Sequence, residues 1–325
     1  MQIAQNLLHG HSRVQHFPVS FFAAVMGTAG LGIALERGAQ VVPLLRPLSL
    51  AMVAVASLGF LGLLAVYGAK LVTHRAEVRL EFVHPVRLHF FPTISISLLL
   101  LSIAFFRIEP NVALMLLVIG APLHLMFTLT VLDQWLHRES FQVPHLNPAW
   151  FIPIVGNLVV PLAAAPLGYT EIGWFYFAIG IVFWLPMFAI ILNRVLFHQP
   201  LPERMAPTLF ILIAPPAVAF LAYLRLTGSL DAFARILYFF ALFLTLFLAT
   251  QVPRLVRMPF YLSWWAYSFP LAAMTIASYA MHEKSGLPAY LLIAHGLLAI
   301  TACVVAGLAL RTGLAATRHE LCVPE

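Results

Sequence analysis

His124 and His295 lie inside long apolar runs of the sequence, where a titratable ring could do chemistry. A histidine within a membrane could carry a proton for a coupled transporter. Two facing histidines could instead ligate a haem, as in a membrane cytochrome. No paired histidine spacing recurs on one run, as a two-haem protein would require. We therefore expect both rings to be hydrogen-bonded between helices, and proton coupling and haem binding stay open as alternatives.

Charged side chains are nearly missing from the middles of the apolar runs, where ion-coupled carriers use them. Asp133 lies at the end of one run and is expected at a membrane interface. The sequence contains no HExxH, GxSxG or phosphate-loop motif. These features favour passive conduction over pumping and argue against a hydrolase. We expect no enzyme activity, no metal and no cofactor.

Phe269 and Pro270 lie in the middle of another apolar run, 262–277. Proline has no N–H for the carbonyl of Ala266, so a helix must bend or break there. A carbonyl freed in this way survives within a membrane only against packed protein or a watery cavity. A large uncharged ring, Phe269, stands immediately before the break. The pattern predicts a pore-lining helix that Phe269 closes.

Neutral polar side chains near helix breakers could hold an anion weakly. Thr28, Ser95 and Asn157 offer two hydroxyls and an amide within the apolar runs. Such donors, together with broken helix ends, can bind an anion without a fixed positive charge, and weak binding suits rapid passage. The alternative is that small polar residues join neighbouring helices.

The composition places the whole chain in a membrane. Of 325 residues, 62% are hydrophobic and 9% are charged, far fewer than the roughly 25% charged residues of soluble domains. Continuous apolar stretches favour helices over strands. We expect an all-α membrane protein with a single domain over 1–325 and a lipid bilayer as its surroundings. The excess of 18 basic over 12 acidic residues is typical of membrane proteins and does not indicate nucleic-acid binding.

Ten membrane spans can be marked along the chain. They are expected at about 17–35, 45–73, 88–106, 110–134, 148–167, 172–195, 206–225, 231–252, 261–281 and 287–311. Twelve basic residues fall in the termini and in the connectors after even spans, against six after odd spans. This bias predicts that both termini, about 1–16 and 312–325, are cytoplasmic.

Helix breakers recur with a rough period. Pro92, Pro153, Pro215 and Pro270 lie in the third, fifth, seventh and ninth spans, separated by 61, 62 and 55 residues. The first span has no central proline, but its Gly27, Gly30 and Gly32 fall where the period predicts one. The repeat predicts five helical hairpins around a pseudo-fivefold central pore, with odd helices inside and even helices outside.

Several segments resemble the tellurite-resistance/dicarboxylate transporter family, which includes bacterial TehA proteins and the plant guard-cell slow anion channels. The most specific is WWAYSFP at 264–270, which is close to the pattern of the plant channels. Weaker matches are 155–157 (VGN), 177–180 (FAIG), 214–216 (APP), 26–28 (MGT) and 84–87 (HPVR). The likeness covers essentially the whole membrane portion.

The resemblance implies a homotrimer of ten-helix protomers, each with its own pore occluded by the residue that corresponds to Phe269. It also implies an anionic cargo, inorganic or organic. Relatives have a glycine facing the gate in their first helix where this chain has Ala23, a departure that would narrow the pore or alter the rotamer of Phe269. We predict an anion channel or channel-like uniporter of a bacterial-type cytoplasmic (inner) membrane. The alternative is a proton-coupled exporter of C4-dicarboxylates, sulfite or tellurite that uses His124 or His295.

Overall fold

The computed structural model describes residues 13–322. The expected terminal segments, about 1–16 and 312–325, are therefore described only from residue 13 and up to residue 322. Over these residues the chain is helical almost throughout and contains no strand. Within the same part of the chain, nine helices are long and apolar enough to cross a membrane. The prediction of an all-α membrane protein is confirmed.

Long α-helices form the second, fourth, sixth, eighth and tenth predicted spans, and one short 3₁₀ turn, Pro43–Leu45, precedes the first of them. They are α3 (Arg46–Thr73), α6 (Pro110–His137), α9 (Thr170–Phe197), α11 (Ala232–Ala249) and α14 (Pro288–Thr317). Proline lies in the first turn of α3, α6 and α14. Backbone N–H groups in a first turn have no intrahelical acceptor, so the missing N–H of proline costs nothing there. The Asp231 carboxylate caps α11 by accepting from the N–H of Ala234 at 3.0 Å.

The other five predicted spans begin as 3₁₀ helices and continue as α-helices. They are Val19–Phe21 with α2 (Phe22–Ala39), Arg87–Phe90 with α5 (Pro92–Phe105), Glu203–Ile213 with α10 (Ala214–Thr227), and Leu262–Tyr267 with α13 (Ser268–Ser285). The fifth span alternates twice: 3₁₀ Pro148–Phe151, α7 (Ile152–Val155), 3₁₀ Gly156–Val159, α8 (Val160–Ala164) and 3₁₀ Ala165–Leu167.

The four periodic prolines mark these changes of helix type. Pro92, Pro215 and Pro270 lie in the first turn of α5, α10 and α13, and Pro153 lies in the first turn of the short α7. The bend or break predicted at Pro270 therefore takes the form of a change from 3₁₀ to α geometry. The reason is that proline is accommodated where a new α-helix begins, since the first turn has no i−4 acceptor to satisfy.

Burial alternates along the chain in step with this difference. In the first, third, fifth and seventh spans, 72% of the residues in the most apolar window are buried, whereas the share in the five long helices is 22–39%. The expectation that odd helices lie inside even helices is therefore confirmed for these spans. Most residues of α13 are also buried, although α13 is not among the nine apolar candidates. Its sequence mixes serine, threonine and tyrosine with apolar residues.

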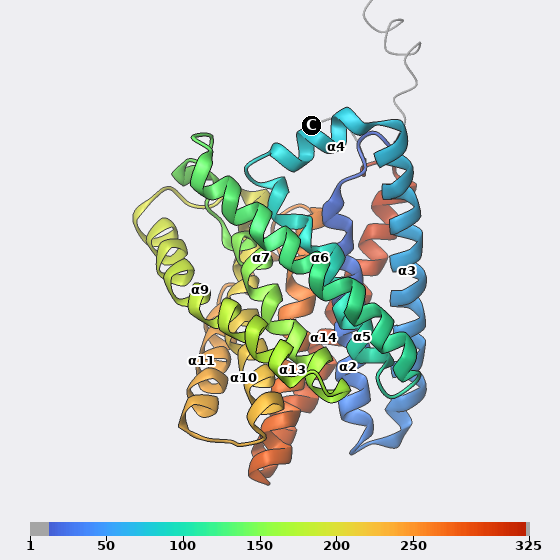
Figure 1. Ribbon diagram of the computed structural model, residues 1–325, viewed down its shortest axis with the longest axis vertical. Coiled ribbons are helices and arrows are strands. Elements are labelled where there is room, and N and C mark those ends of the chain that lie inside the picture. The colour runs from blue at the N-terminus through green and yellow to red at the C-terminus, as the bar shows by residue number, and fades with distance from the viewer. Residues whose placement is uncertain (1–12, 323–325) are drawn as a thin grey trace, which may run out of the picture.

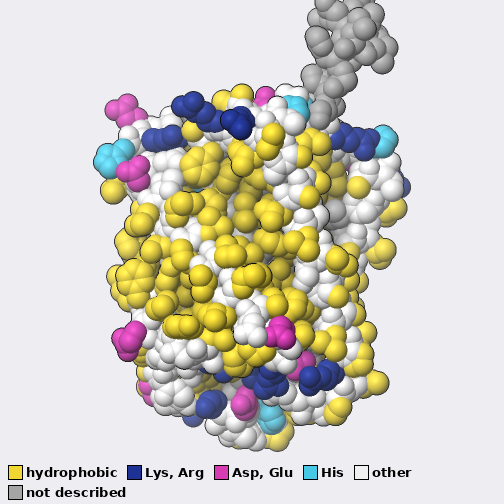
Figure 2. Space-filling view, turned by 45° about the vertical axis from the view of Figure 1, so that its right-hand side comes forward, with side chains coloured by type: hydrophobic (Ala, Val, Ile, Leu, Met, Phe, Trp, Pro, Cys, Tyr) yellow, Lys and Arg dark blue, Asp and Glu magenta, His cyan; other side chains and the backbone are white. Residues whose placement is uncertain are grey.

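The two described ends of the chain meet at one end of the molecule, called the terminal end below. Arg13 contacts the imidazole of His319 there, and the short helix α4 (Arg75–Val83) lies across the same end (Figure 1). The sequence did not predict α4, because its charged residues suggested a connector. The four-residue helix α12 (Val252–Leu255) was likewise missed. Figure 2 shows an apolar belt between two bands of charged side chains, as expected for a bilayer-spanning protein.

Candidate functional site

Two cavities enter the bundle from opposite ends. The larger, about 1150 Å³, opens at the terminal end, where His16 and Cys322 are among its lining residues. We call it the terminal cavity. The smaller, about 460 Å³, is lined by residues at the far ends of α2, α10 and α13, including Arg37, Arg225 and Lys284. We call it the distal cavity. The two cavities approach each other inside the bundle, where they share lining residues.

Three apolar side chains are common to the walls of the two cavities. Val159, Val218 and Phe269 are the described residues that line both cavities. They come from the fifth, seventh and ninth spans, so three inner segments meet at this level. Val159 and Val218 are buried, whereas Phe269 is half-buried. Among the three, the ring of Phe269 is the largest side chain, and it separates the cavities without any charged group.

Phe269 owes its position to the start of α13. It is the second residue of that helix and follows the 3₁₀ segment Leu262–Tyr267. Helix α2 approaches α13 closely, because a Cβ atom added to Gly27 would lie 2.0 Å from Ser268 Oγ. One turn further along α2, a Cβ added to Gly30 would lie 3.6 Å from Phe269 Cδ2. The absence of side chains on α2 therefore makes room for the start of α13 and for the ring.

Ala23 lies elsewhere along α2. It lines the terminal cavity and precedes Gly30 by seven residues, about 10 Å along a helix. Gly30 of α2 lies against Phe269, and Ala23 lines the terminal cavity together with Phe269. The narrowing that the resemblance implied at Ala23 remains a prediction about the terminal cavity.

The remaining candidates divide by location. Pro270 lines the terminal cavity, whereas Gly27, Thr28, Gly30, Pro92, Ser95, Pro153, Asn157 and Pro215 are not among the residues that line either cavity. Ser95 joins two helices, whereas Thr28 bonds within its own helix. Ser95 Oγ lies 2.9 Å from both the carbonyl of Pro92 and Nδ1 of His124. Thr28 Oγ1 donates to the carbonyl of Ala24 at 2.8 Å.

Asn157 repairs the backbone where proline and 3₁₀ geometry leave carbonyls free. Its Nδ2 lies within 3.1 Å of the carbonyls of Pro153 and Ile154 and of Thr128 Oγ1. The side chain is fully buried. The hydroxyl of Thr128 also donates to the Pro153 carbonyl at 2.8 Å. Asn157 therefore joins neighbouring helices, which was the alternative to anion binding for these polar residues.

The two membrane histidines have different surroundings. His124 is fully buried, and its Nε2 lies against Gly156, where an added Cβ would come within 2.5 Å of that nitrogen. His295 packs edge-on against Tyr279, with ring centroids 5.6 Å apart. Neither histidine lines a cavity. The two rings contact different helices, so the described structure does not present them as a facing pair for haem.

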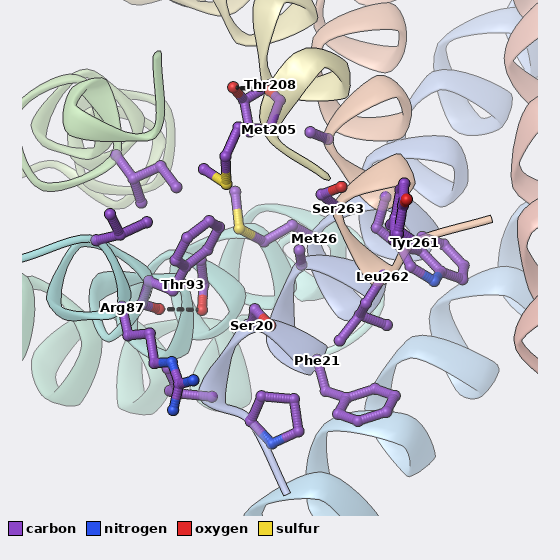
Figure 3. A pocket seen from close by; sticks show the side chains of 18 of the residues that line it. Ser20, Phe21, Met26, Arg87, Thr93, Met205, Thr208, Tyr261, Leu262 and Ser263 are labelled. Atoms are coloured by element: carbon purple, nitrogen blue, oxygen red, sulfur yellow. Dashed lines mark hydrogen bonds between the residues drawn. The ribbon is translucent and has the colours of Figure 1, made fainter. Parts of the chain in front are cut away.

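The polar groups that do line the terminal cavity were not singled out by the sequence. Ser20, Thr93, Thr208 and Ser263 surround it, with Met26 and Met205 between them (Figure 3). The hydroxyl of Thr93 donates to the carbonyl of Phe90 at 2.5 Å, and that of Thr208 donates to the carbonyl of Met205 at 2.6 Å. Each threonine directly follows a proline. A Pro-Thr pair within an inner span is the signal that could have found them.

A buried ion pair supports the wall of the terminal cavity. Lys70 Nζ donates to Glu81 Oε2 at 2.8 Å and to the carbonyl of Phe17 at 2.8 Å. Glu81 also accepts from the hydroxyl of Tyr67 and from the N–H of Val19. Both charged side chains are at most 4% exposed. This cluster joins α3, α4 and the start of the first span, and it holds the mouth of the cavity in shape.

The sequence matches one family over most of its length. The SLAC1 family, described as voltage-dependent anion channel, matches residues 16–313. The chain is 29% identical to a tellurite resistance protein TehA homolog of Haemophilus influenzae over 86% of this chain and 87% of that protein. It is 27% identical to an uncharacterized transporter of Methanocaldococcus jannaschii over 85% of this chain and 87% of that protein.

Plant relatives are longer. The chain is 30% identical to the S-type anion channel SLAH3 of Arabidopsis thaliana over 83% of this chain, and it spans 44% of that channel's length. The resemblance drawn from residues 264–270 and the weaker motifs is confirmed by these matches.

Proposed function

Because the chain belongs to the voltage-dependent anion channel family, we propose that it is an anion channel or channel-like uniporter in which Phe269 closes the path through each protomer. The family includes channels and transporters, as the names of the plant and Methanocaldococcus relatives indicate. Anions are therefore the proposed cargo. The single observation that supports the gate is that Phe269 lines both cavities, so the path passes this ring.

Passive flow is supported by the nature of the barrier. The three residues shared by the cavities are a phenylalanine and two valines, and none of them can change charge. A rotation of one aromatic side chain would join the cavities without moving a helix. A proton-coupled carrier needs a titrating group that reaches the path. The ring of His124 packs against Gly156. Neither His124 nor His295 lines the terminal or the distal cavity.

We further propose ten membrane crossings arranged as five hairpins about a central axis, in one domain. The meeting of Arg13 with His319 supports an even number of crossings, and α13 supplies the tenth. The five spans that change from 3₁₀ to α geometry support a fivefold repeat. A homotrimer, a cytoplasmic (inner) membrane location and cytoplasmic termini complete the proposal, and the distribution of basic residues supports the orientation.

The experiment that tests the gate is single-channel recording of the Phe269→Ala variant in planar bilayers. We expect at least a severalfold rise in anion current, because the largest side chain between the cavities is removed. Phe243→Ala is the matched control, because Phe243 is 58% exposed on α11 and lines neither cavity. Reversal potentials in two salts separate a channel from a carrier and rank the ions. An unchanged current in folded Phe269→Ala protein would refute the gate.

A further inference from the structure

The two cavities differ in charge. The distal cavity is lined by five cationic side chains and two carboxylates, an excess of three positive charges. They are Arg37, Arg46, Arg107, Arg225 and Lys284, with Glu36 and Glu283. The terminal cavity has as many carboxylates as Lys and Arg side chains, three of each. The positive charge along the path is therefore concentrated on one side of Phe269.

The two distal carboxylates are already shared among three arginines. Glu36 lies 3.8 Å from Arg46 and 3.6 Å from Arg107, and Glu283 lies 3.5 Å from Arg37. These pairs are partly exposed, so each is a weak, water-screened contact. They organise the arginines around the cavity but do not neutralise it.

Arg225 is one of the two cations, with Lys284, that these carboxylates leave without an ion pair among the described residues. It lies in the last turn of α10, and its side chain is exposed toward the distal cavity. No ion pair joins it to a carboxylate of residues 13–322. The charged groups that act on it are Arg37, Arg107 and Glu283, two cations against one carboxylate. Lys284, by contrast, donates to the carbonyl of Gly228 at 2.7 Å.

We propose that the distal cavity is an anion-loading site, with Arg225 as its principal ligand, and that it favours small oxyanions and carboxylates. This inference rests on the proposed channel function. Four of the five cations are arginines, and the planar guanidinium fork matches two oxygen acceptors of one anion better than a spherical halide. Phe269 also lines the distal cavity, so an anion bound in this cavity lies next to the proposed gate.

The site is built for weak binding. Its cations stand in a cavity of about 460 Å³ that is open to water, where each charge acts through a high dielectric. An anion that binds weakly can leave toward the opened gate, as conduction requires. Because the terminal cavity carries no matching excess, an open channel conducts asymmetrically at low salt.

The test uses Phe269→Ala as an open background and compares Arg225→Gln with Arg235→Gln. Arg235 is a matched control, since it is an exposed arginine at the same end of the molecule that lines neither cavity. In symmetrical low-concentration sodium nitrate we expect Arg225→Gln to lower conductance about threefold, the Boltzmann weight of one unit charge roughly 7 Å away in water. We expect the rectification of the current to decrease in the same variant. Near 1 M salt, where the screening length is about 3 Å, the difference disappears.

Arg225→Lys tests the preference for oxyanions, because it keeps the charge and removes the fork. We expect it to restore chloride conductance but not nitrate conductance, whereas equal restoration of both would overturn the oxyanion class. If Arg225→Gln conducts and rectifies like Arg235→Gln at low salt, the loading site is refuted and the channel stands. If folded Phe269→Ala protein carries no anion current at all, the channel function fails and this inference fails with it.

Discussion

Gly30 of α2 faces the ring of Phe269, and a Cβ atom added to Gly30 would lie 3.6 Å from Phe269 Cδ2 and 3.0 Å from Ala272 Cβ. The first distance is an ordinary van der Waals contact, and the second is tight. A side chain at position 30 would therefore press on the ring and on the helix that carries it.

We predict that Gly30→Ala lowers the anion current of the otherwise unchanged protein, because the added methyl restricts rotation of the Phe269 ring. Single-channel recording measures the effect as a lower open fraction. In the Phe269→Ala background the same substitution should leave the open fraction unchanged, since the ring is gone. An equal loss in both backgrounds would mean that Gly30 acts by some route other than the ring.

The buried pair Lys70–Glu81 predicts a large effect on stability. Glu81→Gln leaves the ammonium of Lys70 buried without its carboxylate, and breaking a buried pair in this way costs about 3–5 kcal/mol. We expect a marked fall in the Tm of the detergent-solubilised protein. Glu77→Gln on the same helix is the control. Among the described residues, the side chain of Glu77 accepts a hydrogen bond from Gln15 and forms no buried ion pair. Similar Tm values for the two variants would contradict the role given to the pair.

The cap of α11 predicts a dependence of stability on pH. The backbone N–H of Ala234, followed by the hydroxyl of Tyr223, lowers the pKa of Asp231 below its usual value. A lowered folded-state pKa stabilises the protein above the unfolded pKa of about 3.9, and that stability is lost as the pH falls through the folded pKa. We expect Asp231→Ala to lower the Tm at pH 7 and to differ less from the wild type as the pH approaches 3. A Tm difference that stays constant over this range would rule out the charge as its cause.

The helices were predictable because the signals that specify them are local. Runs of apolar residues located the spans to within a few residues, with 172–195 expected and α9 found at Thr170–Phe197. The spacing of Pro92, Pro153, Pro215 and Pro270 correctly separated the buried odd spans from the exposed even ones. The helix α4 was not predicted, because its charged residues resemble a connector and Glu81 is held in part by the N–H of Val19, 62 residues away.

The candidate site was predictable only in part. Phe269 could be singled out because a proline follows it, and proline acts on the helix that contains it. Ser95 and Asn157 carry the same chemistry as Thr93 and Thr208, yet the first two face neighbouring helices and the last two face the terminal cavity. The rotation of a helix about its axis decides whether a side chain faces a neighbouring helix or the cavity. Packing against other helices sets that rotation.

By itself the sequence determined that the chain is helical, lies in a membrane and has weakened inner helices, because hydropathy and proline act within one segment. Only the tertiary structure decided that Gly30 stands against Phe269 and that this ring lines two cavities. It also decided that five cations from α2, α3, α10, α13 and the residue at 107 gather at one mouth. These are relations between segments far apart in the chain, and they exist only once the helices have packed together.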